Sequence, residues 1–377
     1  MNQSSLGIYL HTPFCVKKCA YCDFYSITDR RLIGPYVDAL KREIQRAECL
    51  GQVDTVYWGG GTPSILPVET VAEVMDVLAA RFEILPDAEI SLEANPGTVN
   101  SAYLKELKRT GINRLNLGVQ SLNDQDLSFL GRIHNAGEAV KAIDLARQAG
   151  FENLGIDLIY GLPGQTRSDL EHQIRTAAAL TVEHISCYLL TLEPATPLAR
   201  RVAQGTVALP DETQASQLMT AMAELLAAAG YHRYEISNFA REERYICRHN
   251  RRYWTMAPYL GFGPAAHSFV PPRRYWNLSS VSGYIEAITD GRGPVAGSET
   301  LTREQRILEA VYLDLRLIEG IDLAAFESVF QVTVQHLFGP HWAGLLASNI
   351  LEINNGWLRL TEKGLLLADA VPLYLDI

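Results

Sequence analysis

Three cysteines near the N-terminus form the grouping in the sequence with the clearest chemistry. Cys15, Cys19 and Cys22 stand in the spacing C-x3-C-x2-C, directly after a short apolar run, Leu6–Leu10. Three thiolates on one tight loop suit three irons of a [4Fe–4S] cube, because thiolate is the soft ligand that iron–sulfur clusters use. Position 24, where a fourth close cysteine would stand, is Phe24. One iron is therefore left open to bind a small molecule.

A zinc site is the alternative interpretation of this loop. Structural zinc takes four ligands, usually as two separated pairs, and His11 would have to complete the set. His11 lies on the strand side of Pro13, so joining the cysteines would require an awkward chain reversal. Buried cysteines without a metal are the remaining alternative. The spacing favours the cluster, and Phe14, Tyr21 and Phe24 would shield it from water.

The elements that must position this loop alternate between strand and helix up to about Thr191. Apolar runs predict strands at Leu6–Leu10, Val53–Trp58, Ala88–Glu93, Arg114–Val119, Asn153–Ile159 and His184–Leu190. Amphipathic stretches predict helices at Gly34–Leu50, Pro67–Arg81, Ser101–Arg109, Ala136–Ala149 and Ser168–Ala179. Repeated βα units predict a parallel sheet with helices outside it. We expect an α/β fold, a partial (β/α)6 barrel, with an open doubly wound sheet as the alternative.

Polar residues and glycines follow most of these strands. They are Gly60, Gly61 and Thr62 after the second strand, Glu93 at the end of the third, Gln120 after the fourth and Asp157 within the fifth. Each taken alone is typical of a plain turn or a satisfied carboxylate. Ligand sites in such folds form at the carboxyl ends of successive strands, so their joint placement favours a binding site.

Composition limits the classes of protein that remain. The 377 residues are 47% hydrophobic and carry a net charge of −10, which argues against nucleic acid as the main partner. The longest apolar runs are too short for a membrane span, and the N-terminus shows no signal peptide. Six cysteines, three of them at metal-binding spacing, fit a reducing compartment better than a disulfide scaffold. We therefore expect a cytoplasmic protein.

A second informative stretch runs from Cys247 to Trp254, with the sequence CRHNRRYW. It supplies a histidine, two aromatic rings and three arginines, and a porphyrin needs an axial ligand, apolar faces and cations for its propionates. The alternative is a buried loop in which His249 and Asn250 satisfy backbone groups, and the residue types alone favour this alternative. Cys247 and His267 are further candidate iron ligands.

The C-terminal part predicts a separate small domain. Helices are expected at Thr302–Leu317, Asp322–Val329 and Val334–Leu346, followed by a hairpin around Asn354-Asn355-Gly356. This pattern resembles a winged helix, but its acidic residues argue against DNA binding. We divide the chain into a barrel at 1–240, a connecting segment at 241–297 that ends in the linker-like sequence GRGPVAG, and a winged-helix-like domain at 298–377.

The cysteine motif resembles that of the radical S-adenosylmethionine (SAM) superfamily, and Y-x-H-x-P-F-C-x3-C-x-Y-C-D-F resembles its coproporphyrinogen-dehydrogenase (HemN) branch. The resemblance implies that SAM binds the open iron and is cleaved to a 5′-deoxyadenosyl radical. It also implies roles for single residues. Tyr9 would approach SAM; Gly60, Gly61 and Thr62 would bind its amino end; Glu93 and Arg132 would meet its charged ends; and Gln120 and Asp157 would bind its ribose.

Within that branch the chain is most similar to the HemW haem chaperones, whose H-N-x-x-Y-W motif matches His249, Asn250, Tyr253 and Trp254. The dehydrogenases carry a further cysteine where this chain has Phe24, and they have a longer segment before the cluster. The resemblance thus implies haem as a ligand and haem-acceptor proteins as partners, membrane-associated ones among them. An electron donor for the cluster is also implied. Oxidative decarboxylation of coproporphyrinogen III to protoporphyrinogen IX is the alternative function.

Overall fold

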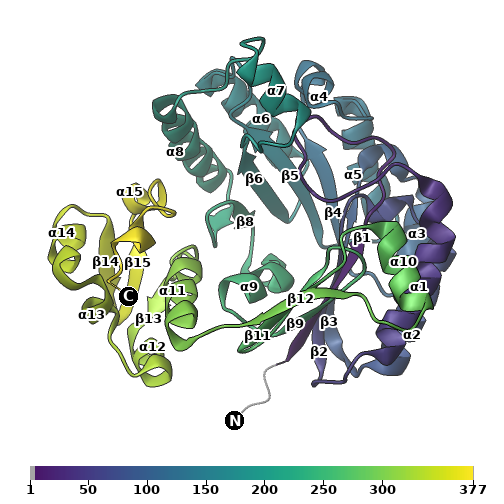
Figure 1. The fold of residues 1–377 in the computed structure, drawn as a ribbon. Helices are drawn as coiled ribbons and strands as arrows, with labels where there is room; N and C mark the ends of the chain where they lie inside the picture. Colours follow the sequence, from purple (N-terminus) through teal and green to yellow (C-terminus); the bar gives the residue numbers. More distant parts are fainter. Residues whose placement is uncertain (1–4, 377) are drawn as a thin grey trace.

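A twelve-stranded sheet forms the larger part of the computed structural model, which describes residues 5–376 (Figure 1). Its central parallel strands are β1 (Leu6–Thr12), β2 (Val53–Gly60), β3 (Ile84–Ala94), β4 (Arg114–Gln120), β5 (Leu154–Tyr160) and β6 (His184–Leu189). These six strands lie side by side in chain order. A doubly wound sheet would reverse its order at one point. The predicted partial (β/α)6 arrangement is therefore confirmed.

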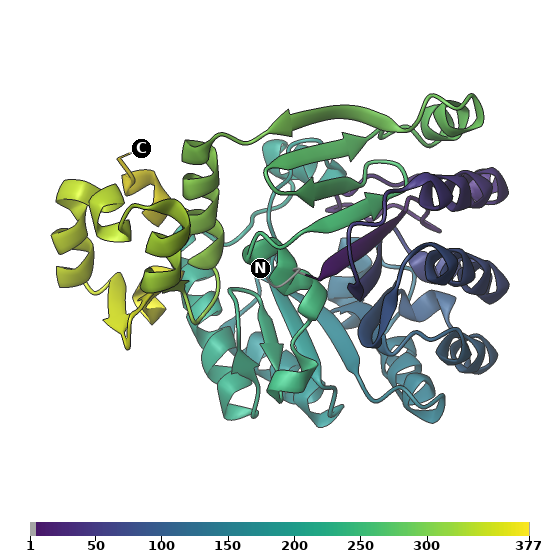
Figure 2. The same cartoon turned by 90° about the horizontal axis from the view of Figure 1, so that it is seen from below.

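The helices that connect these strands line the outer side of the curved sheet (Figures 1 and 2). They are α1 (Ile33–Arg46), α2 (Val68–Arg81), α3 (Ser101–Arg109), α4 (Asp124–Leu130), α5 (Ala136–Gln148) and α6 (Arg167–Ala179). Side-chain caps set their starts: Asn135 and Glu138 form a capping box at α5, and Thr166 and Asp169 form one at α6. Their apolar faces pack on the strands in one continuous core.

The segment after α7 (Pro197–Ala203) and α8 (Glu212–Ala228) extends the sheet at both edges. The added strands are β7 (His232–Arg233), β8 (Asn238–Ala240), β9 (Tyr259–Phe262), β10 (His267–Val270), β11 (Arg273–Asn277) and β12 (Val295–Thr300). β9 pairs in parallel with β1, and β10 to β12 follow it antiparallel. The last residues of the linker-like sequence 291–297 belong to β12. The predicted connecting segment thus contains strands that the sequence did not predict.

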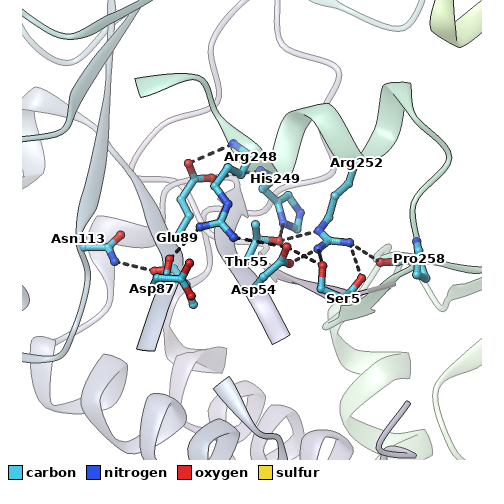
Figure 3. Close-up of polar contacts among 11 residues, drawn as sticks. Ser5, Asp54, Thr55, Asp87, Glu89, Asn113, Arg248, His249, Arg252 and Pro258 are labelled. Atoms are coloured by element: carbon cyan, nitrogen blue, oxygen red, sulfur yellow. Dashed lines mark hydrogen bonds and ion pairs between the residues drawn. The ribbon is translucent and has the colours of Figure 1, made fainter. Parts of the chain in front are cut away.

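Helix α9 (Arg248–Trp254), which contains the H-N-x-x-Y-W motif, lies on the inner side of the sheet (Figure 1). Figure 3 shows how its arginines hold it against the amino-terminal halves of β2 and β3. The buried Arg252 guanidinium pairs with Asp54 and donates to the Thr55 hydroxyl at 3.0 Å and the Ser5 carbonyl oxygen at 2.8 Å. Glu89 accepts the first backbone N–H groups of the helix at 3.1 Å. The motif is therefore fixed at the end of the strands opposite the cysteine loop.

A buried carboxylate joins the added strands to the barrel. Glu43 of α1 accepts hydrogen bonds from the Gly263 N–H at 2.8 Å, the Asn277 amide at 2.6 Å and the Tyr284 hydroxyl at 2.5 Å. Tyr284 belongs to α10 (Val281–Thr289), so one side chain connects three separate elements. Three donors to one carboxylate compensate much of the cost of burying it.

Burial also makes the contribution of Glu43 to stability depend on pH. Burial raises the pKa of Glu43 from 4.5 to about 7, although its three donors oppose this shift. A carboxyl whose pKa is raised in the folded state contributes stability below its unfolded pKa, and this stability is lost as pH rises through the folded pKa. We expect the free energy of unfolding of wild type, relative to Glu43→Gln, to fall by up to about 3 kcal/mol as the pH rises from about 4.5 to 7. A pH-independent difference in urea unfolding would contradict this.

The C-terminal part has a core of its own, built around Val311, Leu315, Phe338, Leu351 and Leu358. Its elements are α11 (Arg303–Asp314), β13 (Ile321–Asp322), α12 (Leu323–Phe330), α13 (Val334–Phe338), α14 (Trp342–Ala347), β14 (Leu351–Asn354), β15 (Trp357–Leu360) and α15 (Glu362–Leu365). The predicted hairpin is present between β14 and β15. The predicted third helix is interrupted at Gly339-Pro340. No helix within residues 5–376 combines the length and apolar character needed to cross a bilayer.

Candidate functional site

The three cysteines of the motif lie on the loop after β1, and all three thiols are free and partly exposed. Two of them receive a side-chain donor: the Thr62 hydroxyl lies 3.6 Å from Cys15 Sγ, and Arg132 Nη1 lies 3.4 Å from Cys19 Sγ. Burial raises the pKa of Cys22, and the neighbouring Cys19 and Cys15 raise it further. Donors aimed at sulfur stabilise thiolates, the form in which cysteine binds metal. The donors therefore favour anionic sulfur at Cys15 and Cys19, whereas burial opposes it at Cys22.

His11, the residue that a zinc site would need, is fully engaged elsewhere. Its Nε2 lies 3.0 Å from the Tyr25 carbonyl oxygen and must donate to it, so its Nδ1 accepts from the Tyr9 hydroxyl at 3.0 Å. Burial lowers the pKa of His11 to about 4, which keeps the ring neutral. No three His, Cys, Asp or Glu residues within 5–376 are gathered around a point suited to one metal ion. His11 positions the loop through Tyr25 and leaves no nitrogen for a metal.

The glycine loop after β2 packs directly on the cysteine loop. Gly60 has a φ of +105°, and a Cβ there would lie 2.7 Å from the His11 ring. A Cβ on Gly61 would lie 2.6 Å from the Phe14 carbonyl oxygen. The Gly61 N–H donates to the Thr12 carbonyl oxygen at 2.8 Å. These glycines are therefore required for contact with the chain itself, in addition to any contact with a ligand.

Arg132 lies between the cysteine loop and the end of β4. Its Nη2 donates to the Gly118 carbonyl oxygen at 2.8 Å, while its Nε–H is buried without a partner among the described residues. Gln120, at the end of the same strand, has a φ of +69°, in the left-handed region that non-glycine residues seldom adopt. Such outliers occur preferentially at functional sites. A guanidinium with an unused donor suits a carboxylate ligand.

Glu93 and Asp157 lie deeper, where they line a small polar cavity of about 30 Å³. Glu93 accepts from the Tyr57 hydroxyl at 2.7 Å, and Asp157 accepts from the Asn116 amide at 2.8 Å. Burial, and to a smaller extent the charge of Asp157, raise the pKa of Glu93 to about 7. The cavity has room for one or two water molecules. The remaining lining residues are Tyr57, Arg114, Asn116, His184, Ser186, Tyr188, Cys247 and Asn250.

Sequence reasoning missed Arg114 and His184 in this lining. Arg114 begins β4 and His184 begins β6, and both are almost completely buried. Nδ1 of His184 has no partner among the described residues. One signal in the sequence could have revealed them: each is an ionisable residue at the start of an otherwise apolar strand. Ionisable residues are rarely buried without a partner, so such a position indicates a polar site in the interior.

The motif histidine is enclosed in the interior. His249 is completely buried, its Nδ1 lies 2.9 Å from the Thr55 hydroxyl, and its Nε2 lies 2.9 Å from the Tyr253 hydroxyl. Burial, and to a smaller extent the charge of Arg252, lower the pKa of His249 to about 3. Both ring nitrogens are thus occupied in this conformation. Iron could bind one of them only if α9 moved.

Stacked aromatic rings connect the H-N-x-x-Y-W motif with Tyr9, one of the predicted SAM residues. The His249 ring stacks on Tyr57 at 5.2 Å and on Tyr9 at 6.4 Å, and Tyr253 packs edge-on against it at 5.3 Å. Asn250 shares the cavity with Glu93. Trp254, at the other end of the helix, lies 5.0 Å from the Arg316 guanidinium, just beyond α11. The structure therefore brings together Tyr9, Glu93, Asp157 and the motif, although the cysteines lie at the far end of the strands.

Comparisons with known proteins agree with this architecture. The sequence model of the Radical SAM superfamily matches residues 9–177, and that of the HemN C-terminal domain matches residues 301–367. A relative named heme chaperone HemW from Mycobacterium tuberculosis is 37% identical to this chain. The alignment covers 98% of this chain and 95% of the relative. Another, from Bacillus subtilis, is 35% identical over 96% and 97% of the two chains.

Among solved structures, the coproporphyrinogen III oxidase HemN from Escherichia coli superposes with a TM-score of 0.85. It is 25% identical, and the match covers 99% of this chain and 90% of that one. Both the barrel and the C-terminal domain are therefore shared with that structure. The chain belongs to the HemW family of the radical SAM superfamily.

Proposed function

We propose that the protein is a cytoplasmic haem chaperone that carries a [4Fe–4S] cluster and SAM, binds haem and transfers it to acceptor proteins. The observation that carries the proposal is the near full-length similarity to relatives named heme chaperone HemW. The H-N-x-x-Y-W motif at His249–Trp254 adds support. An electron donor reduces the cluster in this scheme, and the acceptors include membrane-associated haem proteins.

The residues on the cysteine loop fit a cluster. Cys15, Cys19 and Cys22 provide three free thiols, and Thr62 and Arg132 point donors at two of the sulfurs. When bound, the cluster supplies an electron and an open iron site. The unpaired Nε–H of Arg132 would bind a SAM carboxylate, and the backbone of Gly60, Gly61 and Thr62 would border its amino group. Tyr9 would hold His11 and so keep the cysteine loop in place.

Two substitutions should separate SAM binding from cluster binding. In the proposal Glu93 and Arg132 meet the charged groups of SAM, while Gln120 and Asp157 bind its ribose hydroxyls. We expect Asp157→Asn and Gln120→Ala to weaken SAM binding about tenfold, because each removes a hydrogen bond to the ligand. Iron content should be unchanged, since neither side chain hydrogen-bonds to Cys15, Cys19 or Cys22. Calorimetry on the anaerobically reconstituted protein measures the affinity, and wild-type affinity in both variants would remove these residues from the site.

For the haem motif, we propose that α9 forms the wall of the haem site next to the SAM residues. Tyr253 packs edge-on against Tyr259 of β9 at 4.8 Å, so the motif borders the inner face of the added strands. His249 would bind iron only after giving up its hydrogen bonds to Thr55 and Tyr253. Asn250 would then contribute from the polar cavity that it shares with Glu93, and Trp254 from its contact with Arg316.

A haemin titration followed by Soret absorbance tests the proposed function. We expect wild type to bind haemin saturably, one per chain, and to pass it to an apo-haem protein on mixing. Human serum albumin denatured by heat serves as a control for nonspecific uptake of haemin by exposed apolar surface. A wild-type titration that never saturates would rule the chaperone function out.

The alternative function is the dehydrogenase reaction, which the similarity to HemN favours. The two differ in one measurable outcome: the enzyme converts coproporphyrinogen III anaerobically in the presence of SAM and a reductant. Phe24, which replaces the additional cysteine of the dehydrogenases, is 71% exposed on the cluster loop. Formation of protoporphyrinogen IX by the reconstituted protein would establish the enzyme and displace the chaperone proposal.

A further inference from the structure

An exposed histidine lies on the inner face of the added strands. His267 is the first residue of β10, and its side chain is open to solvent. It stands opposite Trp276 of β11, and the two rings stack at 5.9 Å with an interplanar angle of 27°. Its place on this face follows from the register of the strands, because residues two apart on a strand share one face. Phe269, two residues further along, pairs with Tyr259 of β9.

Tyr259 connects this face with the motif helix, since it packs edge-on against Tyr253. Arg274 of β11, opposite Phe269, points to the same side and pairs with Glu299 at 2.7 Å and with Glu309 of α11 at 3.1 Å. His267 therefore lies on the face of the added strands that contacts α9 through Tyr259 and α11 through Arg274.

The chemical state of His267 suits an iron ligand better than that of His249. Within residues 5–376 neither ring nitrogen of His267 makes a hydrogen bond, whereas both nitrogens of His249 do. Partial burial lowers the pKa of His267, and the charge of Arg274 acts in the same direction. Haem iron binds the neutral imidazole through an unprotonated nitrogen.

Trp276 fixes the orientation of this imidazole. A coordinating imidazole stands perpendicular to the porphyrin, so the porphyrin would lie across the edges of both stacked rings. Gly297 of β12 stands opposite Trp276, and a Cβ there would lie 2.7 Å from the indole ring. The glycine thus leaves Trp276 the room to stack on His267. Arg274 is already paired with Glu299 and Glu309, so it is not free to bind the haem propionates. The propionates would therefore point toward solvent, away from these two carboxylates.

We propose that His267 is an axial ligand to the iron of bound haem, held in position by Trp276. The proposal rests on the proposed function, since it names the ligand for the haem that the chaperone carries. It differs from the motif-based expectation in placing the iron on β10, while His249 keeps its interior hydrogen bonds to Thr55 and Tyr253.

The test titrates haemin into wild type, His267→Ala, His267→Cys, His249→Ala and the matched control His172→Ala. His172 is an exposed histidine on α6, on the outer side of the sheet. We expect His267→Ala to raise the haemin Kd at least about tenfold. His172→Ala should bind as wild type does. His267→Cys should bind with a shifted Soret maximum, because a thiolate replaces the imidazole on iron.

Iron-free protoporphyrin IX separates ligation from loss of packing, and His267→Ala should bind it as wild type does. Wild-type haemin affinity in His267→Ala, or an unshifted spectrum in His267→Cys, would overturn the assignment. Loss of binding in His249→Ala alone would also overturn it and return the iron to the motif. These outcomes all presuppose saturable wild-type binding, whose absence would instead contradict the proposed function.

Discussion

Replacing Cys19 with alanine should reduce the iron content of the anaerobically reconstituted protein from about four atoms per chain to nearly none. The loop offers three thiolates for the cube, and two thiolates leave a second iron without a protein ligand. Loss of Cys19 also leaves the Arg132 Nη1 donor, now 3.4 Å from its sulfur, without an acceptor. Iron analysis and absorbance near 400 nm measure the loss.

Cys49 provides the matched control, because it is a free and exposed cysteine outside the motif. Cys49→Ala should keep wild-type iron content, and Cys15→Ala and Cys22→Ala should behave as Cys19→Ala does. A Cys19→Ala protein that still holds four irons per chain would place the cluster elsewhere. Cys187 and Cys247 are both buried and are less suited as controls, since their replacement would also leave cavities in the interior.

The second large effect is expected on stability and concerns the arginine that holds α9. Arg252→Ala should lower the free energy of unfolding by about 3–5 kcal/mol, because it removes the buried cation of the largely buried Asp54 carboxylate and leaves only the partly exposed Arg248 beside it. The Ser5 carbonyl oxygen, 2.8 Å from Arg252 Nη1, loses this donor at the same time, while the Pro258 carbonyl oxygen keeps the Gly7 N–H at 3.1 Å. Urea unfolding followed by circular dichroism measures the change.

Arg248 supplies the matched control on the same helix. It also lies near Asp54, at 3.5 Å, but its side chain is 41% exposed. Exposed ion pairs contribute little, so Arg248→Ala should cost about 1 kcal/mol or less. Equal losses for the two variants would show that the position of α9 does not depend on the buried network drawn in Figure 3.

The parts of the fold that could be predicted from sequence are those with local signals. Each central strand is an apolar run, and each predicted helix between them ends within about four residues of its prediction, because side-chain caps and turns set these limits. The hairpin at Asn354–Gly356 was equally local: Asn355 and Gly356 adopt φ values of +49° and +85°, the left-handed pair that a tight hairpin needs.

The position of the haem motif could not be predicted, because it depends on contacts between residues far apart in the chain. Arg252 contacts Ser5 across 247 residues, and no spacing within the motif indicates that His249 reaches Thr55. The strands β9 to β12 were missed for a related reason. Each is only four to six residues long, and partner strands, rather than local pattern, determine whether such short segments form a sheet.

Because β1 pairs with β9, the sheet around β1 can be completed only late in synthesis of the chain. The strand that precedes the cysteine loop is made first, but its neighbour on one side emerges only after residue 262, roughly 70 residues after the end of β6. At about 5–20 residues per second this interval lasts several seconds on the ribosome. During it β1 is an open edge, and the His11 carbonyl lacks its contact with Gly263. A chain interrupted before residue 262 would therefore present its three motif cysteines next to an unfinished sheet, so the proposed cluster would be assembled on the finished loop only in the nearly complete chain.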